Sequence, residues 1–489
     1  MANAATIITF IIYLIFLLCV GLYFYKRTNS LEDYILGGRS MGVWVTALSA
    51  QASDMSGWLL MGLPGAVFLY GIGQSWIAIG LFIGTVLNWI LVAPRLRVYT
   101  EETSSLTLSS FFENRFKDSS GLLRVISAVI TLIFFTIYAS SGMAGAGKLF
   151  EAMFGIPYVS AVIGGCIVIV IYTFLGGFLA VCWTDLFQGA LMFFSILIVP
   201  IVAYNAHGGA EAIVNVAQIK NISLSLFDTG SGIAGVVAII STMAWGLGYF
   251  GQPHILARFM SIKNVKELSR STTIATIWVL ISLAGAILVG LIGMVMYQQA
   301  PGGDAEKVFI YMISDLFNPW IGGILLAAIL SAIMSTIDSQ LLVSSSALTE
   351  DFYQKIINKN ASEKELIWVG RICVIVISVL AMVLALNPKS SILSLVSYAW
   401  GGFGAAFGPV VLMALFSKKT TAKSALAGMI TGAVVCVLWK EIGLGAQMYE
   451  IVPGFIANFL VIQIMNRVSP QKDSAILKQF DEMKGILSK

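Results

Sequence analysis

Long apolar runs recur along this chain from end to end, and they restrict its possible folds more than any other feature. Each run holds roughly 20 residues, the length of an α-helix that crosses a hydrocarbon core about 30 Å thick. Inside lipid, only helices and closed barrels satisfy every backbone hydrogen bond. Charged residues make up 11% of the 489 positions, whereas soluble proteins carry about 25%. The sequence therefore predicts an all-α integral membrane protein that forms a single transmembrane domain, 1–489.

The apolar runs predict thirteen transmembrane helices. The first has no basic residue before it and no small-residue cleavage site after it, so we expect a retained helix rather than a signal peptide. Two further segments, 107–116 and 305–317, have one apolar side and are predicted to be amphipathic surface helices. Their expected role is to cover helix ends, and the alternative for the outer segment, 305–317, is to cap an entrance. The predicted membrane helices cover residues 7–25, 42–71, 74–94, 122–149, 157–177, 183–204, 232–257, 271–298, 320–347, 366–386, 391–416, 421–439 and 448–466.

The distribution of basic residues among the loops predicts the orientation. If the amino terminus lies outside, 24 of the 29 Lys and Arg residues fall on the inner side, including those of the tail 467–489. This is the positive-inside pattern of a bacterial inner (plasma) membrane protein with a cytoplasmic carboxyl terminus. The basic residues form no single patch, so nothing indicates nucleic-acid binding. The five basic residues left outside are Lys148, Lys220, Lys307, Lys389 and Lys440.

The second predicted helix is interrupted by polar residues near its middle. Residues 50–58 include Asp54, three polar side chains and a glycine. A charged group at that depth costs roughly 2.5–3.5 kcal/mol even on the mild insertion scale. Asp54 is therefore expected to face a cavity, a partner or an unwound segment of backbone. The alternative is close helix packing through small residues around one hydrogen-bonded aspartate.

The seventh predicted helix is interrupted in a similar way. Residues 245–253 contain three glycines and Pro253, which weaken the helical hydrogen bonds at midspan. Paired interruptions about 190 residues apart indicate a secondary transporter built from inverted repeats, with its substrate near the membrane midplane. Predicted helices two to six, residues 42–204, would then mirror helices seven to eleven, residues 232–416.

The ninth predicted helix carries hydroxyl groups that suit a small cation. Ala332, Ser335 and Thr336 are spaced i, i+3 and i+4, so they share one helix face. A hard alkali cation prefers oxygen ligands, and two hydroxyls with freed backbone carbonyls supply these without net charge. Such a neutral cage suits a monovalent ion better than Ca²⁺ or Mg²⁺. The alternative is that the hydroxyls bond to the preceding helical turn.

Three other ionisable residues have no single predicted role. Asp338 follows the hydroxyl pair and fits either a second ion site or the salt bridge of a gate. His254 and Arg258 lie near the inner end of the seventh helix, where an inner gate and a contact with lipid headgroups are both compatible with the pattern. The five cysteines lack metal-ligand spacing, so no transition-metal site is predicted.

Four motifs together resemble the sodium/solute symporter family, and the similarity runs across nearly the whole chain. The resemblance implies a leucine-transporter-type fold, in which a five-plus-five inverted repeat has one leading helix, 7–25, and two trailing helices, 421–466. The motifs are Leu-Gly-Gly-Arg-Ser at 36–40, Ala-Ser-Asp-Met-Ser-Gly-Trp at 52–58, Tyr-Thr-Phe-Leu-Gly-Gly-Phe at 172–178 and Met-Ser-Thr at 334–336.

The resemblance also implies which residues form the sites. The sodium ligands would be the carbonyls of Ala52, Met55 and Ala332 and the hydroxyls of Ser335 and Thr336. Residues expected to shape the ion site or take part in coupling are Asp54, Arg39 and Asp185. Residues expected to contact the substrate are Ser56, Gly57, Tyr138, Trp245, Tyr249 and Pro253.

Within the family, residues 64–68 and 245–260 resemble the members that carry proline. The predicted function is therefore import of L-proline coupled to Na⁺ by alternating access, and not an enzymatic reaction. An aromatic wall could attract the secondary ammonium of proline by roughly 0.5–2 kcal/mol. The expected partners are L-proline, Na⁺ and membrane lipid, with no cofactor, no nucleic acid and a functional monomer. The alternatives are another small solute, such as a sugar, sialic acid or pantothenate, and a membrane sensor with the same fold.

Overall fold

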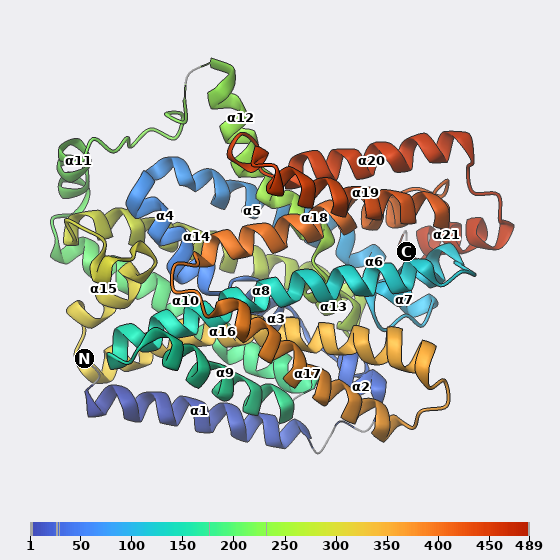
Figure 1. The fold of residues 1–489 in the computed structure, drawn as a ribbon, viewed down its shortest axis with the longest axis horizontal. Coiled ribbons are helices and arrows are strands. Elements are labelled where there is room, and N and C mark those ends of the chain that lie inside the picture. The colour runs from blue at the N-terminus through green and yellow to red at the C-terminus, as the bar shows by residue number, and fades with distance from the viewer. Residues whose placement is uncertain (1–2, 26–27, 29, 176, 231, 488–489) are drawn as a thin grey trace.

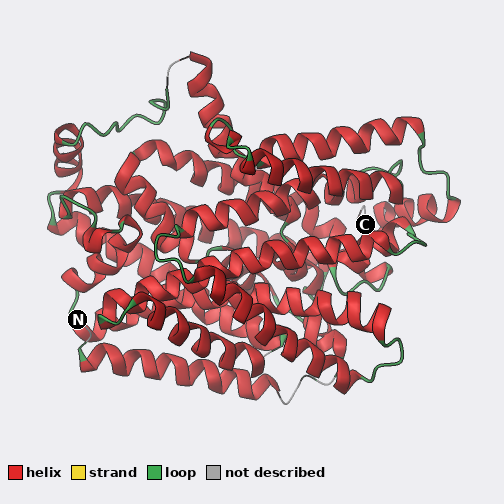
Figure 2. Cartoon of the chain, viewed as in Figure 1, coloured by secondary structure: helices red, strands yellow, loops and turns green. Residues whose placement is uncertain are grey.

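The computed structural model describes residues 3–25, 28, 30–175, 177–230 and 232–487. Over these residues the chain is helical apart from the loops, as Figure 2 shows. One isolated bridge pairs Met41 with Ile262. Some positions used in the expectations above lie outside the described residues, namely Lys26, Arg27, Gly176 and the last two residues of the tail.

Most helices run lengthwise through the molecule in Figure 1, side by side in one bundle. Shorter helices are α2 (Leu31–Leu36), α7 (Leu108–Phe116), α11 (Gly209–Ile219), α15 (Val308–Leu316) and α21 (Ser474–Leu487). Two long elements are interrupted, α3 (Val43–Asp54) with α4 (Leu63–Tyr70), and α12 (Gly232–Met243) with α13 (Pro253–Ser261). The other long helices are α1 (Ala4–Tyr25), α5 (Ser75–Leu87) with α6 (Ala93–Glu102), α8 (Leu122–Phe154), α9 (Tyr158–Leu175), α10 (Phe178–Ala206), α14 (Leu268–Met296), α16 (Pro319–Ser346), α17 (Glu363–Ala385), α18 (Ile392–Phe416), α19 (Ala422–Glu441) and α20 (Ile451–Val468).

The predicted membrane helices all correspond to helical elements of the structure. Among the described residues, eleven helices are long and apolar enough to cross a membrane. The second and fifth predicted helices correspond to shorter apolar helices, Trp58–Tyr70 and Tyr158–Ile171. The all-α membrane fold predicted from the sequence is therefore confirmed.

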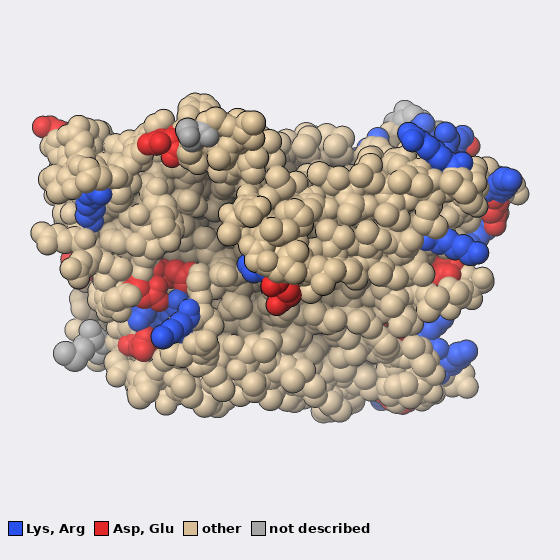
Figure 3. Space-filling model, turned by 45° about the horizontal axis from the view of Figure 1, so that its top comes forward, with Lys and Arg blue, Asp and Glu red and all other residues tan. Residues whose placement is uncertain are grey.

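The surface of the bundle is apolar between two charged ends. We name these ends by the short helix that each contains, the α15 end at the left of Figure 1 and the α7 end at the right. Figure 3 shows few charges over the middle of one face and a gathering of Lys and Arg at its right-hand side. Exposed isoleucines line α1, including Ile11, Ile12 and Ile15. An outer surface of this kind suits lipid and not water.

Helix α16 occupies the centre of the bundle, where it packs against α1, α3, α8, α10 and α17. Its start is fixed locally, because the Asn318 side chain accepts hydrogen bonds from the backbone N–H groups of Trp320 and Ile321. Pro319 follows at the first helical position, where its missing N–H costs nothing. Helix α16 therefore forms a buried axis against which the interrupted helices pack.

The predicted amphipathic segments are helical, but α7 is not a surface helix. Its Phe111 and Phe112 rings are fully buried, and Arg115 is also fully buried. Arg115 donates hydrogen bonds to the carbonyls of Ala414 and Ser417 at the end of α18. The predicted surface position is wrong for α7, because its polar side finds partners in other helices rather than water. The expected role of covering a helix end is confirmed, because Arg115 binds carbonyls at the end of α18.

Candidate functional site

The interruption after α3 is a true break in the helix. Met55 has φ −80° and ψ 73°, outside the helical region, and the chain resumes with a π-helical turn at Trp58–Gly62. The carbonyl of Asp54 accepts hydrogen bonds from the Trp58 indole at 3.1 Å and the Tyr138 hydroxyl at 3.4 Å. Side chains thus replace the helical partners that the break removes, as a buried backbone requires.

The second interruption lies between α12 and α13. The segment Ala244–Gly251 is a tighter 3₁₀ helix, and Gln252 is extended with φ −86° and ψ 105°. A Cβ atom on Gly248 would lie 1.9 Å from Nε1 of Trp400, and one on Gly251 would lie 2.4 Å from the Phe403 carbonyl oxygen. Glycine is therefore needed because this segment lies directly against α18.

The predicted sodium ligands gather where α3 meets α16. The carbonyl of Ala52 accepts hydrogen bonds from Ser335 Oγ at 2.7 Å and Thr336 Oγ1 at 3.4 Å. Ser335 Oγ also contacts the carbonyl oxygen of Ala332 at 3.3 Å. Met55, the fifth predicted ligand, is fully buried at the end of α3. The predicted ligand atoms are all uncharged oxygens, which a small monovalent cation prefers.

Asp54, at the end of α3, connects this helix to the second break. Its Oδ2 accepts a hydrogen bond of 2.5 Å from the Tyr249 hydroxyl, and its side chain is fully buried. Its Oδ1 and both polar atoms of the Gln51 side chain have no hydrogen-bond partner among the described residues. Buried polar atoms are rarely left unpaired. This part of the bundle therefore holds polar groups that a polar or charged cargo can satisfy.

Aromatic rings surround the same region. The Trp58 and Trp245 ring centroids lie 6.3 Å apart, and Tyr249 meets Trp400 edge-on at 5.0 Å. Trp400 stacks on Trp245 at 6.5 Å and donates its indole N–H to the Trp245 carbonyl at 2.7 Å. Tyr138 is buried nearby through its contact with the Asp54 carbonyl. Tyr138 and Tyr249 therefore both contact Asp54, and Trp245 lies beside Trp58 at the same break.

Two of these aromatic residues are absent from the predicted substrate set. Trp58 ends the interrupted motif 52–58, which is a signal that could have found it. Trp400 lies within α18 and is followed by two glycines, a weaker signal. Trp400 contacts the other aromatic residues only because the segment Ala244–Gly251 packs against α18. No sequence pattern within α18 indicates that contact.

Three predicted substrate residues have local roles at the breaks. Ser56 Oγ accepts a hydrogen bond from the Trp58 backbone N–H at 3.3 Å, so it helps the helix to resume. Gly57 lies against α16, where an added Cβ would contact Ile333 at an ordinary distance of 3.4 Å. Pro253 is buried at the first position of α13. All three lie at the two breaks, beside the aromatic cluster.

Asp185 on α10 belongs to a buried polar cluster that reaches Ser339, one turn beyond the predicted sodium ligand Ser335. It forms an ion pair with Arg258 at 3.2 Å and accepts a hydrogen bond from Ser49 Oγ at 2.6 Å. Arg258 also donates to Ser339 Oγ at 2.5 Å, one turn beyond Ser335 on α16. Arg258 is fully buried, which excludes the headgroup contact that its sequence position allowed.

Asp338 lies on another face of α16. Its carboxylate accepts a hydrogen bond from the Thr173 hydroxyl of α9. Among the ion pairs of the described residues, none includes Asp338. The gate salt bridge considered for this residue is therefore not formed in this structure.

Arg39 lies at the α7 end and not in the aromatic cluster. Its guanidinium donates to the backbone carbonyls of Met260 at 2.7 Å, Ser105 at 2.8 Å and Thr100 at 3.0 Å. Burial lowers the pKa of this guanidinium to about 10, so it stays charged at neutral pH. Arg39 therefore joins the end of α2 to α6 and α13.

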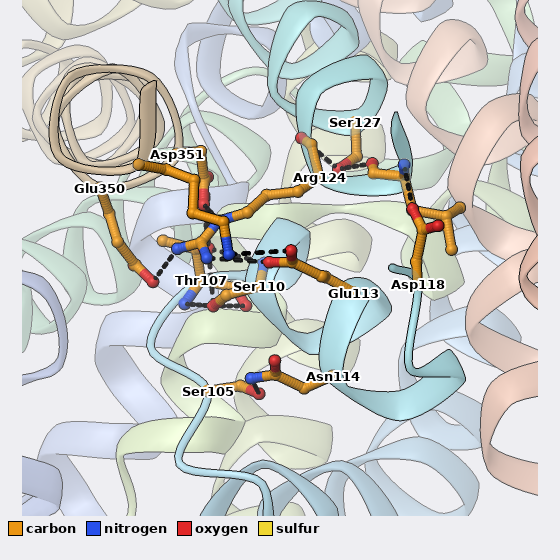
Figure 4. A network of polar contacts seen from close by, with 12 residues as sticks. Ser105, Thr107, Ser110, Glu113, Asn114, Asp118, Arg124, Ser127, Glu350 and Asp351 are labelled. Carbon is orange, nitrogen blue, oxygen red and sulfur yellow. Dashed lines mark hydrogen bonds and ion pairs between the residues drawn. The ribbon is translucent and has the colours of Figure 1, made fainter. Parts of the chain in front are cut away.

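A second network closes the α7 end, and Figure 4 shows Arg124 at its centre. The Arg124 guanidinium forms ion pairs with Glu113 of α7 at 2.9 Å, Glu350 at 2.5 Å and Asp351 at 2.6 Å. Glu350 and Asp351 belong to the π-helical extension of α16, Ala347–Ile357. A cavity of about 370 Å³ lies beside this network, lined by Glu113 and Lys355 among others. At the α15 end, the bundle has a larger cavity of about 700 Å³ lined by Lys148, Glu151, Asp304, Glu306 and Lys307 among others. A hollow with charges of both signs is visible at this end in Figure 3.

Known proteins resemble this chain over almost its entire length. Residues 34–432 match the model of the "Sodium:solute symporter family". The chain is 49% identical over 484 residues to the "Sodium/proline symporter" of Escherichia coli, covering 97% of this chain and 95% of that protein. It is also 49% identical to the "High-affinity proline transporter PutP" of Bacillus subtilis, covering 96% and 100%.

Solved structures share the fold. A Na⁺-coupled sialic acid symporter in a substrate-bound outward-open state superimposes with a TM-score of 0.82 at 21% identity, covering 96% of this chain and 99% of that chain. Mhp1, a nucleobase-cation-symport-1 family transporter, gives a TM-score of 0.57 at 13% identity, covering 93% and 98%. These likenesses confirm the leucine-transporter-type fold.

Proposed function

The chain belongs to the sodium:solute symporter family, and we propose that it carries L-proline with Na⁺ through the site between α3, Ala244–Gly251 and α16. One observation supports this best. The Ala52 carbonyl contacts both Ser335 and Thr336, and Asp54, two residues later, bonds to Tyr249 in the aromatic cluster. An ion site and an aromatic substrate wall thus share one break in one helix.

Sodium would hold α3 and α16 together. In the structure, the Ser335 and Thr336 hydroxyls donate to the Ala52 carbonyl. When Na⁺ binds, the hydroxyls turn their lone pairs to the ion, joined by the carbonyls of Ala52, Met55 and Ala332. The attraction is largest when α3 and α16 are close, so Na⁺ stabilises the arrangement in which the substrate site is complete.

Proline has a carboxylate, a secondary ammonium and an apolar ring. The helix resumes at Gly57 and Trp58, so its positive end lies at the break and attracts the carboxylate. Tyr138, Trp245 and Tyr249 provide flat apolar surface for the ring, and an aromatic face attracts the ammonium.

Transport follows from the repeats moving against each other. We assign repeat 1 to residues 42–204 and repeat 2 to 232–416, because each begins with an interrupted helix. A potential of about 100 mV supplies roughly 2.3 kcal/mol per charge, and a tenfold Na⁺ gradient adds roughly 1.4. At one Na⁺ per proline, this supports about 500-fold accumulation. The proposed unit is a monomer surrounded by lipid, with the α7 end in the cytoplasm.

The decisive experiment is uptake of labelled L-proline by purified protein in sealed lipid vesicles. We expect uptake under an inward Na⁺ gradient and none when K⁺ replaces Na⁺. Unlabelled sugar, sialic acid and pantothenate should not compete. Intact, correctly filled vesicles that take up no proline under either cation would exclude proline as the substrate.

Asp54→Asn tests the charge beside the ion site in the same assay. The amide oxygen still accepts the Tyr249 hydrogen bond, so the substitution removes the ionisable carboxyl group and keeps its shape. We expect the apparent Na⁺ affinity to fall about tenfold. Asp228→Asn, at an exposed loop position, is the matched control and should behave as the unaltered protein.

A further inference from the structure

Tyr449, in the loop between α19 and α20, reaches the substrate wall from outside both proposed repeats. Its ring packs on Trp245 with the centroids 5.6 Å apart and the planes inclined by 32°. Its backbone N–H donates to Ser241 Oγ of α12 at 2.7 Å, and its hydroxyl donates to the Ser397 carbonyl of α18 at 2.6 Å. One residue therefore links α12, the 3₁₀ segment and α18.

The loop that carries Tyr449 is firmly held. The Trp439 indole donates to the Met448 carbonyl at 2.9 Å, which fixes the residue just before Tyr449. On α20, the Asn458 amide donates to the carbonyls of Ala405 and Ala406, both at 2.8 Å. These contacts attach the trailing helices directly to α18, so the position of Tyr449 is determined by rigid elements.

The Tyr449 side chain fits its place closely. A Cβ on Gly401 would lie 3.2 Å from the Tyr449 ring, so a glycine makes room for it. Burial raises the pKa of the Tyr449 hydroxyl well above its ordinary value, so the hydroxyl keeps the proton that it donates to Ser397. The ring cannot leave Trp245 without losing this buried hydrogen bond.

Trp245 is otherwise held by Trp58 and Trp400, through ring contacts at 6.3 and 6.5 Å. What remains exposed of Trp245 faces a cavity of about 350 Å³, which Tyr449, Ser241 and Glu450 also line. Without the Tyr449 ring, the indole could turn toward this cavity and away from Trp58.

We propose that Tyr449 is a positioning residue for substrate binding, which holds the Trp245 indole in the orientation that the substrate requires. The inference rests on the proposed function, because it takes Trp245 as a wall of the proline site. It gives the trailing helices, outside the inverted repeat, a direct effect on substrate affinity.

The test is the kinetics of Na⁺-driven proline uptake by full-length Tyr449→Leu in vesicles. We expect KM for proline to rise about three- to tenfold, the effect of losing one aromatic pair. Vmax per inserted protein and the Na⁺ dependence at saturating proline should stay within about twofold. Tyr449→Phe keeps the ring and should restore most of the affinity. Tyr23→Leu, on the outer surface of α1, is the matched control and should leave KM unchanged.

The double variant Trp245→Leu/Tyr449→Leu separates positioning from a general structural role. If Tyr449 acts through Trp245, KM of the double variant equals that of Trp245→Leu alone. The inference would be overturned if the rise in KM of the double variant were the product of the rises in the two single variants. An effect of Tyr449→Leu on Vmax alone would also overturn it. Tyr449→Met keeps the bulk without the ring, and it replaces Tyr449→Leu in the test if that variant does not reach the membrane.

Failure of this inference is distinguishable from failure of the proposed function. Proline uptake by the unaltered protein, with KM unchanged in Tyr449→Leu, overturns the role of Tyr449 alone. An unchanged KM in Trp245→Leu overturns the assignment of the wall together with this inference. No proline uptake by the unaltered protein overturns both proposals.

Discussion

At the scale of single residues, the α3 break combines two kinds of oxygen. Ser335 and Thr336 supply hydroxyls that face the Ala52 carbonyl, whereas Asp54 supplies a buried carboxylate bonded to Tyr249. The hydroxyls can bind a cation directly at little cost, because they carry no charge that needs desolvation. The Asp54 carboxyl group instead accepts a hydrogen bond from Tyr249, an aromatic residue of the second break.

Removing either hydroxyl should weaken sodium binding. We expect Ser335→Ala to lower the apparent Na⁺ affinity about tenfold, since each lost ligand costs roughly 1–2 kcal/mol. Thr336→Ala should have a smaller effect, because its hydroxyl lies farther from the Ala52 carbonyl, at 3.4 Å against 2.7 Å. The measurement is proline uptake as a function of Na⁺ concentration.

Ser345→Ala is the control for both hydroxyl variants. Ser345 is buried on the same helix, but its hydroxyl donates to the Leu342 carbonyl of its own helix at 2.9 Å. Its replacement should leave the Na⁺ dependence unchanged. An unaltered Na⁺ affinity in both Ser335→Ala and Thr336→Ala would contradict the assignment of the ion site.

At the scale of elements, α7 connects helices that are distant in the sequence. A capping box at Thr107 and Ser110 starts the helix, and the Thr107 hydroxyl also bonds to Asp351. Glu113, near its other end, reaches Arg124 of α8. A short helix thereby joins the start of α8 to the end of α16, and it needs Arg124 to balance three nearby carboxylates.

Loss of that cation should destabilise the protein. Arg124→Gln leaves Glu113, Glu350 and Asp351 close together without their shared partner. Breaking a buried ion pair costs about 3–5 kcal/mol, which should lower Tm in detergent by roughly 5 °C. Lys355→Gln is the control, since its ion pair with Glu113 is half exposed and should contribute less than about 1 kcal/mol. Equal Tm values for the two variants would refute a structural role for the Arg124 network.

At the scale of the whole molecule, the two ends differ. The α7 end is closed by the contacts of Arg39 and Arg124. The α15 end has a cavity of about 700 Å³, while Tyr138 and Tyr249 do not line it and are each only 1% exposed. Tyr138 and Tyr249, two residues of the proposed substrate site, are therefore covered by the rest of the protein.

The proposed orientation predicts which surface positions react from outside the cell. In a variant with Cys19 replaced by serine, Asp228→Cys should react with a membrane-impermeant thiol reagent on intact cells. Lys484→Cys, on α21, should react only after the cells are made permeable. Both positions are exposed, so accessibility of the side chain is matched. The reverse pattern would show that the amino terminus lies inside.

The membrane fold and the positions of both helix breaks could be predicted from the sequence alone. Those features depend on local composition, since a long apolar run must be helical in lipid and a midspan cluster of glycine, proline or charge weakens that helix. The hydroxyl face of α16 was predictable for the same reason, from spacing along one helix. This spacing predicted Ser335 and Thr336 as cation ligands. The family resemblance implied that the Ala52 carbonyl is a further ligand beside them.

Which distant residues surround the two breaks depends on tertiary packing. Trp400 reaches Trp245 because glycines let Ala244–Gly251 lie directly on α18. Tyr449 reaches the same ring because α19 and α20 are fixed to α18. Likewise α7 is buried because Arg124 and the extension of α16 meet it. Such contacts join segments far apart in the chain, and their free energy depends on close packing in three dimensions, which no local pattern records.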